Sequence, residues 1–267
     1  MAASPKVKTK AQVKTQTKVD IPPLKKNIKH LLCDLDGTLI YSGDFRINLA
    51  FLGRTIPTLK RHQGWKAAFR ALKESQSILK IPSEIETNFE RMTKVFQKHF
   101  KLNQEQAINA MKLSMDDIFP KLKSHFGEIK GAAKFLEWAA PRYSLTLATN
   151  PVWSTELVKL RMRWGGINPE LFRSITTADR MHACKPTPEY YREILALEKL
   201  SPSDCLMIGN DREMDLPAAK VGIAVFLLRE RAKTLTCISP PTAKSPGIWR
   251  GNYTHLKKLL ETAPSSL

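Results

Sequence analysis

Short apolar segments alternate with helical patterns along most of this chain, and this alternation is the feature that most restricts its fold. A strand buried on both faces appears in sequence as a continuous apolar run, and parallel neighbours need helical crossovers between them. The alternation begins after Pro22-Pro23 and predicts a parallel sheet flanked by helices. The apolar runs that end near reactive side chains span residues 31–33, 145–148, 174–177 and 205–208.

Polar side chains follow these runs where the predicted strands end. In open α/β sheets, ligands bind beyond the carboxyl ends of the strands, so residues far apart in sequence converge on one crevice. Asp34 and Asp36 follow the first run, two residues apart, which allows both carboxylates to act on one phosphate group. The candidates after the other runs are Thr149, Asn150, Lys185, Asp211 and Asp215.

Helical spacing replaces the alternation between Asp44 and about Phe126. One apolar stripe starts at Trp65, and a second follows Ser83-x-x-Glu86, which has the pattern of a capping box. We therefore expect an all-helical inserted cap domain over residues 45–126, within a core domain formed by residues 21–44 and 127–267. Its expected core residues are Trp65, Ala68, Phe69, Leu72, Leu79, Ile85, Phe89, Met92, Phe96 and Phe100.

The net charge of +18 is spread over the whole chain. Residues 1–30 contribute +7 through eight lysines and Asp20, which leaves +11 for the remainder. Residues 1–20 are rich in Lys, Thr, Gln and Val and bury too little apolar surface to fold alone, so we expect a disordered basic arm. A solubilising tail is the favoured interpretation, and contact with nucleic acid or an anionic surface is the alternative.

Neither a membrane span nor a disulfide framework is expected. Apolar stretches such as 223–228 are too short to cross a bilayer, and the N-terminus lacks the apolar block of a secretory signal, so we expect a cytoplasmic protein. The four cysteines form no Cys-x-x-Cys pair, which argues against a zinc site as well as against disulfides.

Four ordered motifs together resemble those of the haloacid dehalogenase superfamily. The resemblance covers everything except the basic arm and implies a Rossmann-like three-layer sandwich with a parallel central sheet and an inserted helical cap. Residues 161–164, 184–191 and 209–211 resemble a bacterial branch of that superfamily, whose members are known mostly as uncharacterised hydrolases. The motifs are Asp34-x-Asp36-Gly37-Thr38, Ala148-Thr149-Asn150, Lys185-Pro186 and Gly209-Asn210-Asp211-x-x-x-Asp215.

These residues suit the hydrolysis of a phosphate monoester. Asp34 is the expected nucleophile, forming an aspartyl-phosphate, and Asp36 is the expected general acid and base. Lys185 is expected to neutralise the phosphate and the attacking carboxylate, while Thr149 and Asn150 donate to phosphate oxygens.

Mg²⁺ is the expected cofactor, because it takes oxygen ligands and needs only one or two carboxylates. The expected metal residues are Asp34, Asp36, Asp211 and Asp215, with Asp36 contributing its main-chain carbonyl as the resemblance implies. Asn210 departs from the commoner Gly-Asp form of the fourth motif, so the roles of Asp211 and Asp215 are exchangeable.

The presence of Asp36 also restricts which reactions of the superfamily are expected. Dehalogenases of the superfamily lack this second carboxylate, since a halide leaves without a proton, so a phosphatase acting on a small phosphorylated metabolite is favoured. The alternatives are a phosphomutase on a sugar phosphate and a basic nucleic-acid or surface-binding protein that uses the hydrolase fold as a scaffold. Candidate substrate contacts in the insert are Arg46, Arg54, Lys60, Arg61 and His62.

Overall fold

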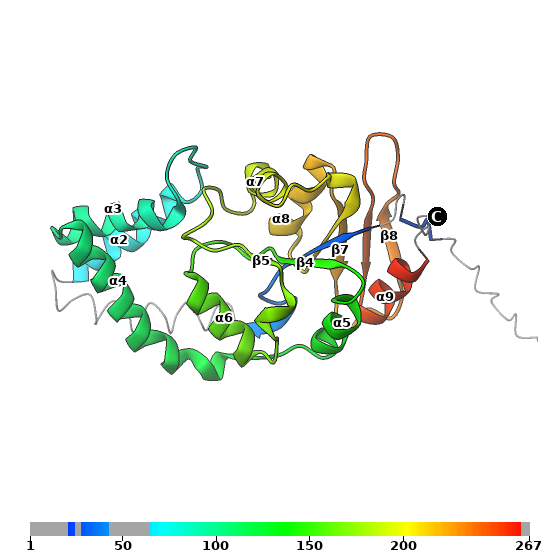
Figure 1. The fold of residues 1–267 in the computed structure, drawn as a ribbon, viewed down its shortest axis with the longest axis horizontal. Coiled ribbons are helices and arrows are strands. Elements are labelled where there is room, and N and C mark those ends of the chain that lie inside the picture. Colours follow the sequence, from blue (N-terminus) through cyan, green and yellow to red (C-terminus); the bar gives the residue numbers. More distant parts are fainter. Residues whose placement is uncertain (1–20, 25–27, 43–64, 263–267) are drawn as a thin grey trace, which may run out of the picture.

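A seven-stranded sheet forms the centre of the described part of the chain (Figure 1). The computed structural model describes residues 21–24, 28–42 and 65–262. The predicted arm over residues 1–20, and the candidate contacts Arg46, Arg54, Lys60, Arg61 and His62, lie outside these residues. In spatial order the strands are β5 (Ser174–Ile175), β4 (Ser144–Leu147), β1 (His30–Cys33), β6 (Cys205–Gly209), β7 (Ala224–Leu228), β9 (Ile248–Gly251) and β8 (Thr236–Ser239).

The sheet is parallel apart from its last pair, β9 and β8, which run antiparallel. β1 lies between β4 and β6, and Cys33 is level with Leu147 on one side and Ile208 on the other. The chain therefore reverses its direction of strand addition at β1, which is where open α/β sheets bind ligands. All three strands end at the same edge, directly before the predicted site residues.

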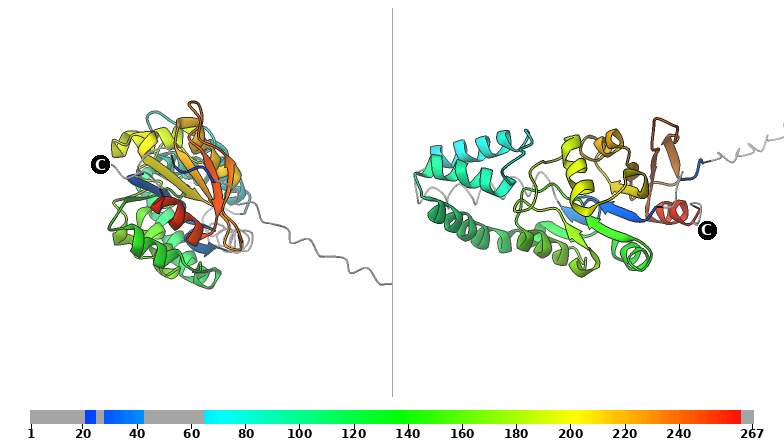
Figure 2. Two further views of the ribbon diagram at one scale, coloured as in Figure 1. Left: turned by 90° about the vertical axis from the view of Figure 1, so that its right-hand side faces the viewer. Right: turned by 45° about the horizontal axis from the view of Figure 1, so that its top comes forward.

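Helices cover both faces of the sheet (Figures 1 and 2). The helices are α5 (Ala132–Ala139), α6 (Thr155–Trp164), α7 (Pro188–Glu198), α8 (Arg212–Asp215) and α9 (Tyr253–Glu261), with the 3-10 segments η2 (Pro169–Leu171), η3 (Pro202–Asp204) and η4 (Leu216–Val221). Side chains of β1 alternate between the faces: Leu31 and Cys33 belong to the apolar cluster with α5, α6 and α9, whereas Leu32 belongs to the cluster with α7 and η4. This arrangement confirms the predicted Rossmann-like sandwich.

A small antiparallel pair marks where the chain leaves the sheet domain and returns to it. β2 (Ile40–Ser42) pairs with β3 (Phe126–Glu128), so the ends of the intervening segment lie side by side. The described part of that segment is helical, and Figure 2 shows its helices lying apart from the sheet. These helices are α2 (Trp65–Ile78), α3 (Asn88–Phe100), α4 (Gln104–Ile118) and the 3-10 segment η1 (Phe119–His125).

The apolar stripes of the insert are only partly correct as predictions of its core. Phe96 and Phe100 are buried in a cluster that joins α2, α3 and α4, as expected from their spacing. Phe69 is 56% exposed and Ile85 is 88% exposed, so these two core predictions are wrong. The side chains of Trp65 and Ala68 are not among those described. The boundaries of the cap domain remain a prediction.

Helix α3 begins one turn later than the capping pattern at Ser83 predicts. Thr87 is the N-cap and forms the capping box with Glu90, whereas the Ser83 hydroxyl accepts from the N–H groups of Ile85 and Glu86 in a preceding turn. Ser83 and Asn88 also donate their N–H groups to the main chain of residues 181–182. These long-range bonds hold residues 83–87 out of the helix, which no local pattern reveals.

Local residues account for two other boundaries. α6 ends at Gly165, and α7 begins at Pro188, a position that suits proline because the first helical N–H groups have no partner within the helix. Among the described helices, none combines the length and the apolarity needed to cross a membrane.

Replacing Thr87 by Ala tests the observed start of α3. The variant loses the hydroxyl that accepts from the Glu90 N–H, and we expect a loss of about 1 kcal/mol in the free energy of unfolding. Ser83→Ala is the control and should cost less, since its hydroxyl caps only a turn. Urea unfolding measures both, and a larger loss for Ser83→Ala would contradict the assignment.

Candidate active site

The predicted site residues line one cavity of about 320 Å³ at the carboxyl ends of β1, β4 and β6. They reach it from the loops that follow these strands and from the loop before α7. Apolar side chains also line the cavity, and most of them come from η1 and β3. The predicted residues in the lining are Asp34, Asp36, Thr149, Asn150, Lys185, Asp211 and Asp215, and the apolar wall consists of Phe119, Leu122, Phe126, Val152 and Trp153.

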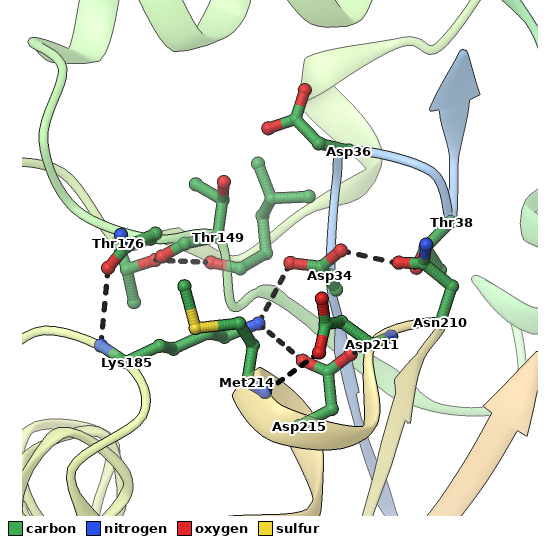
Figure 3. Close-up of polar contacts among 12 residues, drawn as sticks. Asp34, Asp36, Thr38, Thr149, Thr176, Lys185, Asn210, Asp211, Met214 and Asp215 are labelled. Atoms are coloured by element: carbon green, nitrogen blue, oxygen red, sulfur yellow. Dashed lines mark hydrogen bonds and ion pairs between the residues drawn. The ribbon is translucent and has the colours of Figure 1, made fainter. Parts of the chain in front are cut away.

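Lys185 lies between two buried carboxylates. Its Nζ donates to Asp34 Oδ1 at 2.8 Å and to Asp215 Oδ1 at 2.7 Å (Figure 3). All three side chains are nearly excluded from solvent. Burial alone would lower the pKa of Lys185, but the adjacent carboxylate charges raise its pKa well above the ordinary value. The ammonium group is therefore a permanent positive charge in the site.

The Asp34 carboxyl group is close to the midpoint of its titration at neutral pH. Burial raises its pKa from 3.8 to about 7, because Lys185 offsets only part of the desolvation and Asp215 and Asp36 add negative charge. A carboxylate in this position is poorly solvated, so its charged form would be stabilised by further positive charge in the site.

Asp36 faces a different part of the cavity. Figure 3 shows its carboxylate directed away from Asp34 and Lys185. Its partner is Arg161, whose Nη2 contacts both carboxylate oxygens. The Arg161 side chain is 5% exposed and that of Asp36 is 32% exposed. The two predicted catalytic carboxylates thus have separate cationic partners and separate environments.

The turn after Asp36 needs glycine for two reasons. Gly37 has φ of 74°, and a Cβ there would lie 2.3 Å from Asn210 Nδ2. Beside it, the Thr38 hydroxyl lies 3.2 Å from Asp34 Oδ2 and 3.0 Å from Asn210 Oδ1. A hydroxyl carries a single hydrogen, so it donates to one of these acceptors at a time. Asn210, the departure from the common motif, therefore helps to orient the loop of the nucleophile.

The loop after β4 offers hydrogen-bond donors, as expected. Asn150 Oδ1 accepts from the Lys185 main-chain N–H at 3.2 Å, which leaves its amide Nδ2 as a donor. The Thr149 carbonyl accepts from the hydroxyls of Tyr190 at 2.8 Å and Thr176 at 2.7 Å. These bonds fix the main chain of the loop, while the Thr149 and Asn150 side chains line the cavity.

The fourth motif forms the start of α8. Asp211 Oδ1 caps this helix by accepting from the N–H groups of Glu213 and Met214, and the Asp211 N–H donates to Asp215 Oδ2 at 2.9 Å. A Cβ on Gly209 would lie 2.0 Å from Asp215 Oδ2, so the glycine makes room for the buried carboxylate. Asp211 is exposed and Asp215 is buried.

The charge balance of the site fits a divalent cation. Asp34 and Asp215 share one ammonium group, and Asp211 adds a third carboxylate in the same part of the site (Figure 3). Within the described residues, no three His, Cys, Asp or Glu side chains form a group that could hold a metal by themselves. The carboxylate oxygens present are of the kind that Mg²⁺ takes, and this ion keeps several waters and uses one or two carboxylates. Because the Asp36 side chain is paired with Arg161, only its main-chain carbonyl is available as a ligand.

Sequence reasoning did not assign roles to several residues that shape this site. Arg161 lies on a helix and has no local signal that distinguishes it from Arg163, two positions later. Tyr191, which was included only in the family resemblance of residues 184–191, donates to the Met214 carbonyl at 2.7 Å and so ties α7 to α8. The four cysteines are free thiols, and burial raises the pKa of both Cys33 and Cys184 to about 12.

Comparisons with known proteins identify the fold. Residues 28–222 match a family model described as haloacid dehalogenase-like hydrolase. A 2-haloacid dehalogenase from Pseudomonas syringae pv. Tomato DC3000 is similar with a TM-score of 0.57 and 19% identity, over 88% of this chain and 98% of that one. A HAD phosphatase from Thermococcus onnurineus has a TM-score of 0.55 and 17% identity, over 89% of this chain and 100% of that one. No curated protein matches the chain.

Asp34→Asn tests the electrostatic description of the site. A carboxyl group whose pKa rises from 3.8 to about 7 on folding stabilises the fold fully only below the lower value, and this stabilisation is lost as the pH rises to the upper one. The amide that replaces the Asp34 carboxyl group does not ionise, so the variant does not lose this stabilisation as the pH rises. Lys185 keeps Asp215 as its partner. We expect the metal-free variant to be more stable than the wild type by a margin that grows between about pH 4 and pH 7 and is constant above.

Thermal unfolding in EDTA across this pH range measures the margin. Asp204→Asn is the control, because Asp204 pairs with Lys29 at the amino end of the sheet. A margin that stays flat or shrinks with rising pH would contradict the raised pKa of Asp34.

Proposed function

Since this chain belongs to the haloacid dehalogenase-like hydrolase family, we propose that it is a Mg²⁺-dependent phosphatase acting on a small phosphorylated metabolite. The observation that carries the proposal is that Asp36 lines the same cavity as Asp34. A phosphate monoester requires both a nucleophile and a proton donor for its leaving group, whereas a halide departs without a proton. The second carboxylate therefore favours phosphate ester hydrolysis over cleavage of a carbon–halogen bond.

The first chemical step joins Asp34 to phosphorus. An oxygen of Asp34 attacks, the bond from phosphorus to the leaving oxygen breaks, and that oxygen takes a proton from Asp36. Uncatalysed phosphate monoesters hydrolyse so slowly that a catalyst must supply on the order of 20 kcal/mol, most of it through positioning and charge neutralisation. Lys185 supplies one fixed positive charge, and the Asn150 amide and Thr149 hydroxyl donate to phosphate oxygens.

The second step releases phosphate. A water attacks the aspartyl-phosphate, Asp36 accepts the proton of that water, and Asp34 is regenerated. Mg²⁺, held by Asp34, the Asp36 carbonyl and Asp211 or Asp215, would supply the further positive charge that two anionic reactants need. The apolar wall of Phe119, Leu122 and Trp153 reduces access of bulk water to these groups.

Activity assays test this assignment. Phosphate release from p-nitrophenyl phosphate and a panel of phosphorylated metabolites should require Mg²⁺, stop with EDTA and fall below detection in Asp34→Asn. Asp36→Asn should lower kcat by about 10²- to 10⁴-fold, the usual contribution of general acid–base catalysis. Asp204→Asn serves as the folded control with unchanged activity.

Two further measurements distinguish phosphatase activity from dehalogenation and from phosphoryl transfer within a sugar phosphate. Halide release from 2-haloacids, with no phosphate release from any ester, would contradict the phosphatase assignment. Phosphoryl transfer between positions of a sugar phosphate, with little free phosphate, would indicate a mutase instead. Retained phosphatase activity in Asp34→Asn would exclude the proposed nucleophile.

Binding of a polyanion such as nucleic acid is a second candidate function. A surface hollow of about 550 Å³ beside β8 and β9 is lined by Arg229, Arg231, Lys233 and Arg250 and by one carboxylate, Glu230. Arg231, Lys233 and Arg250 are exposed, and none of these three forms an ion pair with a described carboxylate. Unpaired cations around one hollow favour contact with phosphate groups.

Fluorescence anisotropy with a labelled single-stranded oligonucleotide tests this candidate. Binding should weaken steeply with salt, and replacing Arg231, Lys233 and Arg250 by Gln should reduce the salt slope by about 0.7 per lost contact, the value for single strands. The control replaces Lys112, Lys123 and Lys130, which are exposed elsewhere. Equal losses in both triple variants would attribute binding to net charge alone.

A further inference from the structure

Arg161 is a buried cation that the mechanism above leaves without a role. It lies on α6, lines the active-site cavity and is only 4% exposed. Burying a guanidinium group is costly unless it is well paired and hydrogen-bonded. Its position at the cavity therefore calls for an explanation beyond the packing of a helix.

The contacts of Arg161 are concentrated on Asp36. Nη2 contacts both oxygens of that carboxylate, and the guanidinium lies over the ring of Phe126 at 5.4 Å. Nε is buried and has no hydrogen-bond partner among the described residues. An arginine selected only for stability would satisfy its buried donors, because an unpaired donor loses its hydrogen bonds to water and gains nothing in return.

The surroundings keep the guanidinium in place. Phe126 is the first residue of β3, and its ring packs against Trp164 at the end of α6, with centroids 5.5 Å apart. β3 pairs with β2, which closely follows the Asp36 turn, and Asp36 itself bridges to Ile40. Arg161 is thus fixed between the return strand of the insert and the turn that carries Asp36.

We propose that Arg161 is a positioning residue that holds the Asp36 carboxyl group at the leaving-group side of the cavity. This inference rests on the proposed phosphatase function. Figure 3 shows Asp36 directed away from Asp34, so a phosphate attacked by Asp34 would lie between the nucleophile and the side of the cavity that Asp36 faces. Proton transfer requires a heavy-atom distance within hydrogen-bonding range, and a carboxylate without a partner would sample other rotamers.

The dependence of the rate on the leaving group distinguishes a role in proton donation by Asp36 from a general effect of Arg161 on catalysis. Phenyl phosphate and p-nitrophenyl phosphate have similar shapes, but nitrophenolate leaves readily without a proton and phenolate benefits from one. We therefore expect Arg161→Gln to slow the first turnover of phenyl phosphate by about 10- to 100-fold and that of p-nitrophenyl phosphate by less than about 3-fold, with KM nearly unchanged. Arg161→Lys should be intermediate, because an ammonium group keeps the charge but not the planar fork.

Rapid-quench measurement of the released phenol gives these first-turnover rates. Arg163→Gln is the matched control, since Arg163 lies on the same helix, is exposed and should give wild-type rates with both esters. Thermal unfolding identifies a variant that has lost its fold, and Arg161→Lys then provides the test instead.

A double variant tests whether Arg161 acts through Asp36. If it does, Asp36→Asn with Arg161→Gln should be no slower on phenyl phosphate than Asp36→Asn alone, because the two residues act as one unit. Losses that multiply would overturn the inference and place Arg161 in direct contact with the substrate.

The remaining outcomes distinguish this inference from the proposed function. An active wild type with Arg161→Gln equally impaired on both esters, or unimpaired on both, would overturn the role of Arg161 and leave the phosphatase assignment standing. A folded wild type that releases no phosphate from any ester would overturn the proposed function, and this inference with it.

Discussion

The paired contact of Lys185 with Asp34 and Asp215 is the interaction on which the site depends. These residues come from three separate segments: Lys185 precedes α7, Asp34 follows β1, and Asp215 ends α8 after β6. A buried charge is tolerated only where its partners are close, so the ammonium group requires these segments to meet at one point. Tyr191 donates to the Met214 carbonyl on α8, and the Lys185 main chain donates to Asn150 in the loop after β4.

The two predicted catalytic carboxylates lie in contrasting surroundings, and this contrast matches their proposed roles. Asp34 is buried and shares its cation with Asp215, which raises its pKa to about 7 and leaves it in need of further positive charge. Asp36 is partly exposed and has Arg161 to itself. The proposed nucleophile thus lies in a buried, poorly solvated environment, whereas the proposed proton-transfer group is partly exposed and has a cationic partner of its own.

The helical insert is connected to the site by more than its two ends. Asn88, at the start of α3, is fully buried, and its amide donates to the carbonyls of Pro151 and Ala183 at 3.3 and 3.4 Å. These carbonyls lie next to Asn150 and close to Lys185 in sequence. The insert therefore packs directly on the loops that carry the proposed phosphate-binding side chains, so its placement and the geometry of these loops are physically coupled.

Local patterns in the sequence were sufficient to predict the strands that lead to the site. The apolar runs at 31–33, 145–148, 174–177 and 205–208 coincide with or overlap β1, β4, β5 and β6, because a strand buried on both faces needs apolar side chains at successive positions. The capping pattern at Ser83 and the apolar position of Ile85 were misleading, because hydrogen bonds to residues 181–182 hold that segment in a turn outside the helix. A capping pattern carries no information about a partner a hundred residues away.

The sequence by itself determined the order of the motifs, their positions at strand ends and hence the membership of Asp34, Asp36, Lys185 and Asp215 in one site. These features follow from contacts between near neighbours in the chain and from the rule that parallel strands end at a common edge. Only the tertiary structure decided which cation pairs with which carboxylate. Arg161 and Asp36 are 125 positions apart, and Arg163 has the same side chain, so the choice between them depends on which face of α6 packs toward the cavity.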